Sequence, residues 1–124
     1  MLTARAENFL HGKRDLDDTI RRLQAFEKAG ADVLYAPGLR DLATIRTVAA
    51  SVGRPLNVVM SSADPAITAG ELAQAGVKRI SVGGALCRLA LAHMMKGARE
   101  MKERGGFTWI AETLPSQELR KLLT

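Results

Sequence analysis

The sequence predicts an α/β fold in which four parallel strands alternate with helices. Short strand-like stretches at 33–36, 56–60 and 79–82 are separated by helical stretches that end at glycine. The segment QAFEKAGADVLYAPG also repeats the scheme of ELAQAGVKRISVGG: a helix end, Ala-Gly, a polar residue, an apolar strand and glycine. Such units build either a (βα)8 (TIM) barrel or a doubly wound sheet. With a strand at 2–5 only four strands are present, so we expect (βα)4, either half of a barrel or an open four-stranded sheet.

The expected helices and strands follow from the spacing of apolar residues and from the glycines at helix ends. The stretch 15–29 places Leu16, Ile20, Leu23 and Phe26 on one helical face and ends at Gly30. We expect, in order, strand 2–5, helix 15–29, strand 33–36, helix 41–52, strand 56–60, helix 69–75, strand 79–82, helix 85–104 and a final helix at 116–123. We interpret 1–124 as a single half-barrel domain with a helical tail from about residue 105.

Composition narrows the class of protein. Apolar residues make up 47% of the 124 residues and charged residues 25%, which is ordinary globular usage. The single cysteine, Cys87, cannot form an internal disulfide, which favours a reducing cytoplasm. No apolar run reaches membrane-spanning length and the first residues do not resemble a signal peptide, so we expect no membrane partner.

The charge of +5 suits either a nucleic acid or a small anion as the partner. The basic side chains of the helices lie among acidic ones and lack interleaved aromatic residues. This pattern is typical of a solvated surface. We therefore expect no nucleic-acid partner and favour a small anionic carboxylate or oxo acid.

Four segments carry a family resemblance. LTARAENFLHG, QAFEKAGADVLYAPG, RPLNVVM and LAQAGVKRISVGG resemble the second half of the barrel in the isocitrate lyase / phosphoenolpyruvate mutase superfamily. The resemblance covers essentially the whole chain and is greater to the oxaloacetate decarboxylase-like and methylisocitrate lyase-like branches than to the long isocitrate lyases. In this comparison strand 2–5 resembles the fifth barrel strand, and the first four strands have no counterpart.

The resemblance implies Mg²⁺-dependent lyases and mutases that make or break C–C or P–C bonds in small 2-oxo and 2-hydroxy acids. It also implies that the metal carboxylates belong to the first half of the barrel. The acidic cluster Asp15, Asp17 and Asp18 stands at a helix start, where the helix dipole favours negative charge. We therefore expect no metal ligands in this chain, and no catalysis by the chain in isolation.

The resemblance also assigns candidate binding residues. Arg5 matches the arginine that pairs with the substrate's carboxylate or phosphonate, a task that suits a guanidinium fork. Glu7 and Asn8 follow the strand end, where they either orient Arg5 or cap the loop. Asn57 is a substrate-binding candidate too, although we favour a buried amide with a structural hydrogen bond.

Two positions depart from the family pattern. Pro37 stands after the sixth strand, where the lyase branch often has a glutamate and the mutase branch a polar residue. Val59 stands where some members have an asparagine. The bond-breaking chemistry of the lyases therefore does not transfer to this chain, and neither a catalytic residue nor a substrate can be named.

The strand count predicts an oligomer. Strands 2–5 and 79–82 would both be open edges, which invite pairing with another chain. In a lone half-barrel, Val59 and some of Leu34, Val58, Ile80 and Val82 would face water. We expect a homodimer or higher oligomer through this face, or pairing with a separate N-terminal half. A stand-alone anion-binding or self-assembling half-barrel without catalysis is the alternative function.

Overall fold

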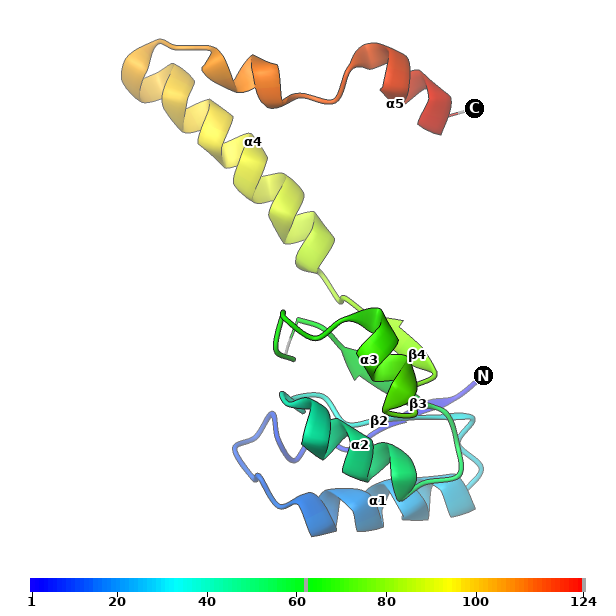
Figure 1. The fold of residues 1–124 in the computed structure, drawn as a ribbon. Coiled ribbons are helices and arrows are strands. Elements are labelled where there is room, and N and C mark those ends of the chain that lie inside the picture. The colour runs from blue at the N-terminus through cyan, green and yellow to red at the C-terminus, as the bar shows by residue number, and fades with distance from the viewer. Residues whose placement is uncertain (62, 124) are drawn as a thin grey trace. The chain divides into compact units, whose positions relative to one another are not determined.

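The computed structural model describes residues 1–61 and 63–123, and Figure 1 shows the helices and strands of each part. The chain divides into two compact units, residues 1–84 and 85–124, which are described separately. The expected organisation as one domain therefore stays a prediction. None of the helices in the described part is long and apolar enough to span a bilayer.

The first unit is built on a parallel sheet. Its strands are β1 (Thr3–Arg5), β2 (Val33–Tyr35), β3 (Leu56–Val59) and β4 (Arg79–Ser81), and they pair in the order β1-β2-β3-β4. Helices α1 (Leu16–Lys28), α2 (Leu42–Ala50) and α3 (Ala69–Gln74) connect successive strands (Figure 1). The predicted α/β class with four parallel strands is confirmed.

The helices of this unit begin at capping side chains. Asp15 and Asp41, which we expected to be the first helical residues, are the N-caps of α1 and α2; their carboxylates accept from the backbone N–H groups of Asp18 and Thr44, both at 2.8 Å. Thr68 and Glu71 form a reciprocal capping box at the start of α3. The other boundaries coincide with the expected ones or differ by at most two residues.

The core lies between the sheet and the three helices. The strands contribute Leu34, Leu56 and Val58 to it, and the helices contribute Leu23, Ile45, Val48 and Leu72. Of the four residues some of which we expected to face water, Leu34 and Val58 are therefore buried. Strand alternation directs them to the helix-covered side, whereas Val33 and Asn57 occupy the opposite face.

Val59 was expected to face water, and this is wrong: its side chain is only 7% exposed. The turn after β4 folds back over it, since a Cβ on Gly83 would lie 3.9 Å from Val59 Cγ2. Ile80 and Val82 are 42% and 40% exposed, as the expectation allowed. Ile80 lacks cover because no helix follows β4 within the described residues of the first unit.

The second unit is a helical segment with little buried surface. It contains α4 (Ala85–Arg104), a short 3₁₀ turn η1 (Thr108–Glu112), which we did not predict, and α5 (Ser116–Leu122). Trp109 of η1 packs on Gly97 of α4, where a Cβ would lie 3.1 Å from the indole ring. Lys96 and Glu112 form an ion pair at 2.6 Å across the same contact.

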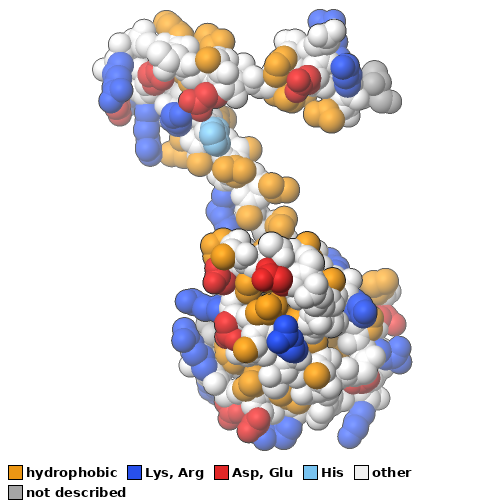
Figure 2. Space-filling view, viewed as in Figure 1, with side chains coloured by type: hydrophobic (Ala, Val, Ile, Leu, Met, Phe, Trp, Pro, Cys, Tyr) orange, Lys and Arg blue, Asp and Glu red, His pale blue; other side chains and the backbone are white. Residues whose placement is uncertain are grey.

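Hydrophobic side chains are exposed along this unit. Figure 2 shows them gathered on α4, and the large ones are Leu86, Leu89, Leu91, Met94, Met95 and Met101. Cys87 lies among them and is exposed too, rather than buried in a core. The second unit thus presents apolar surface that its own residues do not cover.

Candidate functional site

Arg5 ends strand β1, at the edge of the sheet where the carboxyl ends of the parallel strands meet. The strand register aligns it with Tyr35, aligns Tyr35 with Asn57, and aligns Asn57 with Arg79. These four residues therefore form a polar row on the face of the sheet opposite the helices. Loops that follow the carboxyl ends of such strands are the usual location of ligand sites in α/β folds.

Two neighbours hold the Arg5 guanidinium in place. Its Nη2 lies 2.8 Å from Glu7 Oε1, and its carbon lies 5.1 Å from the centre of the Tyr35 ring. Half of the Arg5 side chain stays exposed, at 51%, so the ion pair leaves a face of the cation open to a ligand. Burial raises the pKa of Tyr35, and the charge of Arg5 opposes that rise, so the phenol stays a neutral hydrogen-bond donor at neutral pH.

Glu7 lies beside Arg5, as the sequence led us to expect. Its other carboxylate oxygen lies 3.7 Å from His11 Nε2, a contact that becomes an ion pair when the imidazole is protonated. The Glu7 carbonyl accepts from the backbone N–H groups of Leu10 and His11. Glu7 therefore orients Arg5 and also anchors the loop that follows β1.

Asn8 is turned away from Arg5. It is buried, and its Nδ2 donates to Asp18 Oδ2 at 2.5 Å, which ties the loop to the first turn of α1. A hydrogen bond from Arg22 to Asp18, together with that from Asn8, lowers the pKa of the Asp18 carboxyl, so the acceptor stays ionised. The structure places Asn8 in the scaffold of the loop.

The oxygen and the nitrogen of the Asn57 amide both form hydrogen bonds within the protein. It is 1% exposed, accepts from Arg79 Nη1 at 2.7 Å and donates to Ser81 Oγ at 3.2 Å. This geometry is that of a buried amide with structural hydrogen bonds. Sequence reasoning missed Arg79 and Ser81, although the two-residue period of β4 places both on one face, in register with β3.

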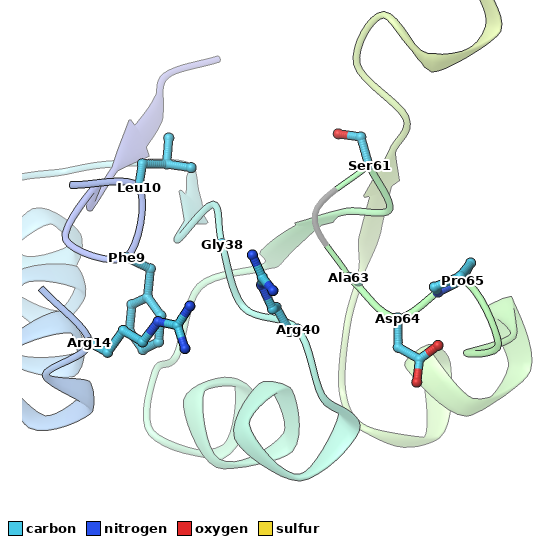
Figure 3. Close-up of a pocket in the computed structure, with 9 residues that line it drawn as sticks. All are labelled: Phe9, Leu10, Arg14, Gly38, Arg40, Ser61, Ala63, Asp64 and Pro65. Carbon is cyan, nitrogen blue, oxygen red and sulfur yellow. The ribbon is translucent and has the colours of Figure 1, made fainter. Parts of the chain in front are cut away.

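A pocket of about 560 Å³ opens among the loops that follow β1, β2 and β3. Figure 3 shows its lining residues, which are Phe9, Leu10, Arg14, Gly38, Arg40, Ser61, Ala63, Asp64 and Pro65. Sequence reasoning did not select them. The available signal was that Arg14, Arg40 and Ser61 each lie in the loop after a predicted strand.

Gly38 permits the close packing of two of these loops. Its φ of +98° belongs to the left-handed region, and a Cβ there would lie 2.8 Å from Phe9 Cβ. Pro37 immediately before it is buried. The loop after β2 thus packs tightly on the loop after β1. Pro37, which departs from the family pattern, is part of the scaffold of this loop.

No metal centre is assembled by the residues that the structure describes: no three His, Cys, Asp or Glu side chains converge on one point. In the acidic cluster, Asp15 caps α1 and Asp18 bonds to Asn8 and Arg22. These carboxylates do not fit a Mg²⁺ site, because Mg²⁺ requires oxygen ligands that converge.

Comparison with known proteins places the fold and the site in context. Residues 1–102 match the phosphoenolpyruvate phosphomutase family. The oxaloacetate decarboxylase of Bradyrhizobium diazoefficiens is 34% identical over 89 residues, which are 68% of this chain and 30% of that protein.

Solved structures agree with that match. A protein of Burkholderia cenocepacia assigned to the lyase/mutase class is 50% identical, with a TM-score of 0.91 over 99% of this chain and 44% of that one. A 2,3-dimethylmalate lyase of the PEP mutase/isocitrate lyase superfamily is 27% identical, with a TM-score of 0.75 over 95% of this chain and 42% of that one. Phosphonopyruvate hydrolase, solved with oxalate and Mg²⁺, shares the fold at 24% identity.

This chain spans less than half the length of each of these proteins. The covered share of the relatives agrees with half of a (βα)8 barrel, one of the two architectures that the strand count allowed. The match over residues 1–102 and the 34% identity to the decarboxylase agree with the resemblance that the four sequence segments indicated. The chain belongs to the phosphoenolpyruvate phosphomutase family, within the isocitrate lyase / PEP mutase superfamily.

Proposed function

We propose that this chain forms the C-terminal half of an enzyme that makes or breaks a C–C or P–C bond in a small 2-oxo or 2-hydroxy acid. The observation that carries the proposal is the half-exposed guanidinium of Arg5, held by Glu7 at the carboxyl end of a parallel strand. Membership of the family, whose relatives include a decarboxylase, supports the same chemistry.

Each residue of the site has a distinct task in this proposal. Arg5 binds the carboxylate or phosphonate of the substrate through two parallel N–H donors. Glu7 and Tyr35 hold the guanidinium in the orientation that this pairing needs. Asn57 and Arg79 fasten strands β3 and β4 beneath the site, so that the polar row keeps its register.

Magnesium, when bound in such an enzyme, polarises an oxygen of the substrate and stabilises developing negative charge. The described residues of this chain do not supply a site for it. We propose that its carboxylate ligands belong to the other half of the barrel. This chain alone then binds the acid without turning it over.

Titration with oxalate tests the binding role of Arg5. We expect amide chemical-shift changes at Arg5 and Glu7 that Arg5→Gln removes and that Arg46→Gln, an exposed control on α2, leaves intact. Loss of one charge-assisted pair should weaken oxalate binding by about ten- to a hundredfold. Shifts confined to residues 96–104 would contradict the proposal.

A turnover assay tests the missing metal site. We expect no Mg²⁺-dependent cleavage of oxaloacetate or methylisocitrate by the chain in isolation. Cleavage that Arg5→Ala abolishes would contradict this. Oxaloacetate loss in a protein-free control is subtracted, because that acid also decarboxylates without an enzyme.

A second candidate function is self-assembly. Two observations favour it: β1 and β4 each pair with only one strand of the described chain, and α4 exposes large apolar side chains. A pair of half-barrels would supply the missing strand neighbours. Sedimentation equilibrium at low micromolar concentration should give a dimer or higher oligomer, whereas a cooperatively folded monomer would contradict it.

A further inference from the structure

The pocket among the strand-end loops contains two arginines that come from different loops. Arg14 follows β1 and Arg40 follows β2, and Figure 3 shows both side chains extending from these loops at the pocket. The hydroxyl of Ser61, after β3, lines the same space. Three consecutive strand ends therefore bring two cations and one hydroxyl donor to a single pocket.

Both guanidiniums lack a partner within the described part of the chain. Neither Arg14 nor Arg40 forms a side-chain hydrogen bond or ion pair with another described residue, in contrast to Arg5 and Arg79. Like charges gathered without a counter-ion repel each other, and an anion between them relieves that cost. The charge arrangement thus favours a negatively charged ligand.

The carboxylates of Asp64, which lines this pocket, and of Asp41, which lines an adjoining one with Arg14 and Arg40, are engaged elsewhere. Asp41 caps α2 by accepting from the backbone N–H and the hydroxyl of Thr44, both at 2.8 Å, and these bonds lower the pKa of its carboxyl. Asp64 accepts from the Ala66 N–H at 2.9 Å, and Figure 3 shows its carboxylate pointing away from Ser61. Neither carboxylate forms an ion pair with Arg14 or Arg40.

The backbone that carries Arg40 is held by contacts with both neighbouring loops. The Asp64 N–H donates to the Arg40 carbonyl at 2.8 Å, which joins the loop after β3 to the loop after β2. Gly38 packs that loop against Phe9, as described above. The pocket is therefore formed by loops that are tied to one another before any ligand arrives.

We propose that this pocket binds a small oxyanion, a carboxylate or a phosphate, through the guanidiniums of Arg14 and Arg40 and the Ser61 hydroxyl. Planar guanidinium forks match both anions, and a hydroxyl donor completes the coordination. The site is separate in its residues from Arg5 and does not depend on the proposed function. The anion is either the second acidic group of a molecule held at Arg5 or an independent ion.

Amide chemical shifts during a titration with inorganic phosphate test the site, with potassium chloride at matched ionic strength as the reference. We expect saturable shifts at Arg14, Gly38, Arg40 and Ser61. Arg14→Gln and Arg40→Gln should each weaken phosphate binding about tenfold or more. Arg46→Gln, on the exposed surface of α2, should leave it unchanged.

Shifts equal to those with chloride, or an equal loss of affinity in Arg46→Gln, would overturn the proposal. Repeating the titration with succinate on Arg5→Gln separates the two sources of the anion. A bridging dicarboxylate would lose affinity in Arg5→Gln as well as in Arg40→Gln, whereas an independent ion would depend on Arg40 alone. Both results support an anion site in this pocket. If Arg5 binds no acid, the outcome of the phosphate titration is unaffected.

Discussion

The two units of this chain differ in how far their apolar side chains are removed from solvent. In the first, Leu23, Leu34 and Ile45 are fully removed from solvent by a sheet packed against helices. In the second, Gly97 is the one buried residue of α4, and Leu89 is 56% exposed. The second unit thus has many large apolar side chains but no hydrophobic core that buries them.

Because of this difference, we expect the first unit, but not the second, to bury enough apolar surface to be stable without further contacts. A segment of about 40 residues rarely buries enough surface to be stable without further covalent, metal or subunit contacts. Its order here comes from helix formation, from Trp109 on Gly97 and from a few ion pairs. We infer that the core of the first unit determines the stability of the chain, and that the solvated apolar side chains of α4 contribute little to it.

The largest difference in unfolding free energy should come from a matched pair of leucine-to-alanine substitutions, one in each unit. Leu34→Ala leaves a cavity in the core and should cost about 2–5 kcal/mol of unfolding free energy. Leu89→Ala should cost about 0.5 kcal/mol or less if α4 is solvated. Urea unfolding followed by circular dichroism measures both. Similar losses in the two variants would show that α4 is covered as completely as the core, and that the contrast between the units is wrong.

An intermediate effect is expected where α4 meets η1. Gly97→Val would force a side chain into the indole of Trp109, at a cost of about 1–3 kcal/mol to the local contact. Fluorescence reports it directly, because Trp109 is the single tryptophan. Its emission should shift to longer wavelength, while the amides of the first unit stay protected from exchange.

Ala98→Val is the matched control for that substitution, since Ala98 is exposed on the next position of the same helix. It adds a β-branched residue without touching the indole. An equal fluorescence shift in Ala98→Val would mean that helix propensity, and not the Trp109 contact, is responsible.

The smallest effect is expected for the pH dependence of the Lys96–Glu112 contact in the second unit. The hydrogen bond from Lys96 lowers the pKa of Glu112 below its ordinary value of 4.5, so the contact stabilises the folded form above that pH and fades as the pH falls through the lowered pKa. Lys96→Met should flatten the acid dependence of Trp109 fluorescence. Lys102→Met, exposed on the same helix, should not. His93 lies 3.7 Å from Glu112 and makes a smaller contribution to the lowering of the Glu112 pKa.

An unchanged acid profile in Lys96→Met would show that Glu112 owes its shift to another neighbour. In the first unit Asp41 also has a lowered pKa, caused by its bonds to Thr44. Because those bonds cap α2 locally, Lys96→Met should leave the exchange of the Thr44 amide unaffected.

Local features of this protein could be predicted from its sequence because their causes lie within a few residues. Asp15 and Asp41 lie within one position of the helix starts that the sequence predicted, and strands β2, β3 and β4 each follow a helix that ends at glycine. The position of Arg5 at a strand end was expected from the stretch 2–5 itself and from the family resemblance. Such signals act through nearby backbone groups, so tertiary context changes their position by one or two residues only.

The site beyond Arg5 was decided by tertiary structure. Asn57 meets Arg79 across 22 positions of sequence, because the register of β3 on β4 sets them side by side. The pocket depends on three loops, and on the absence of a side chain at Gly38. Val59 is buried by a turn that begins more than 20 residues later. Strand register and loop packing arise only when the whole sheet forms, so no local stretch of sequence contains them.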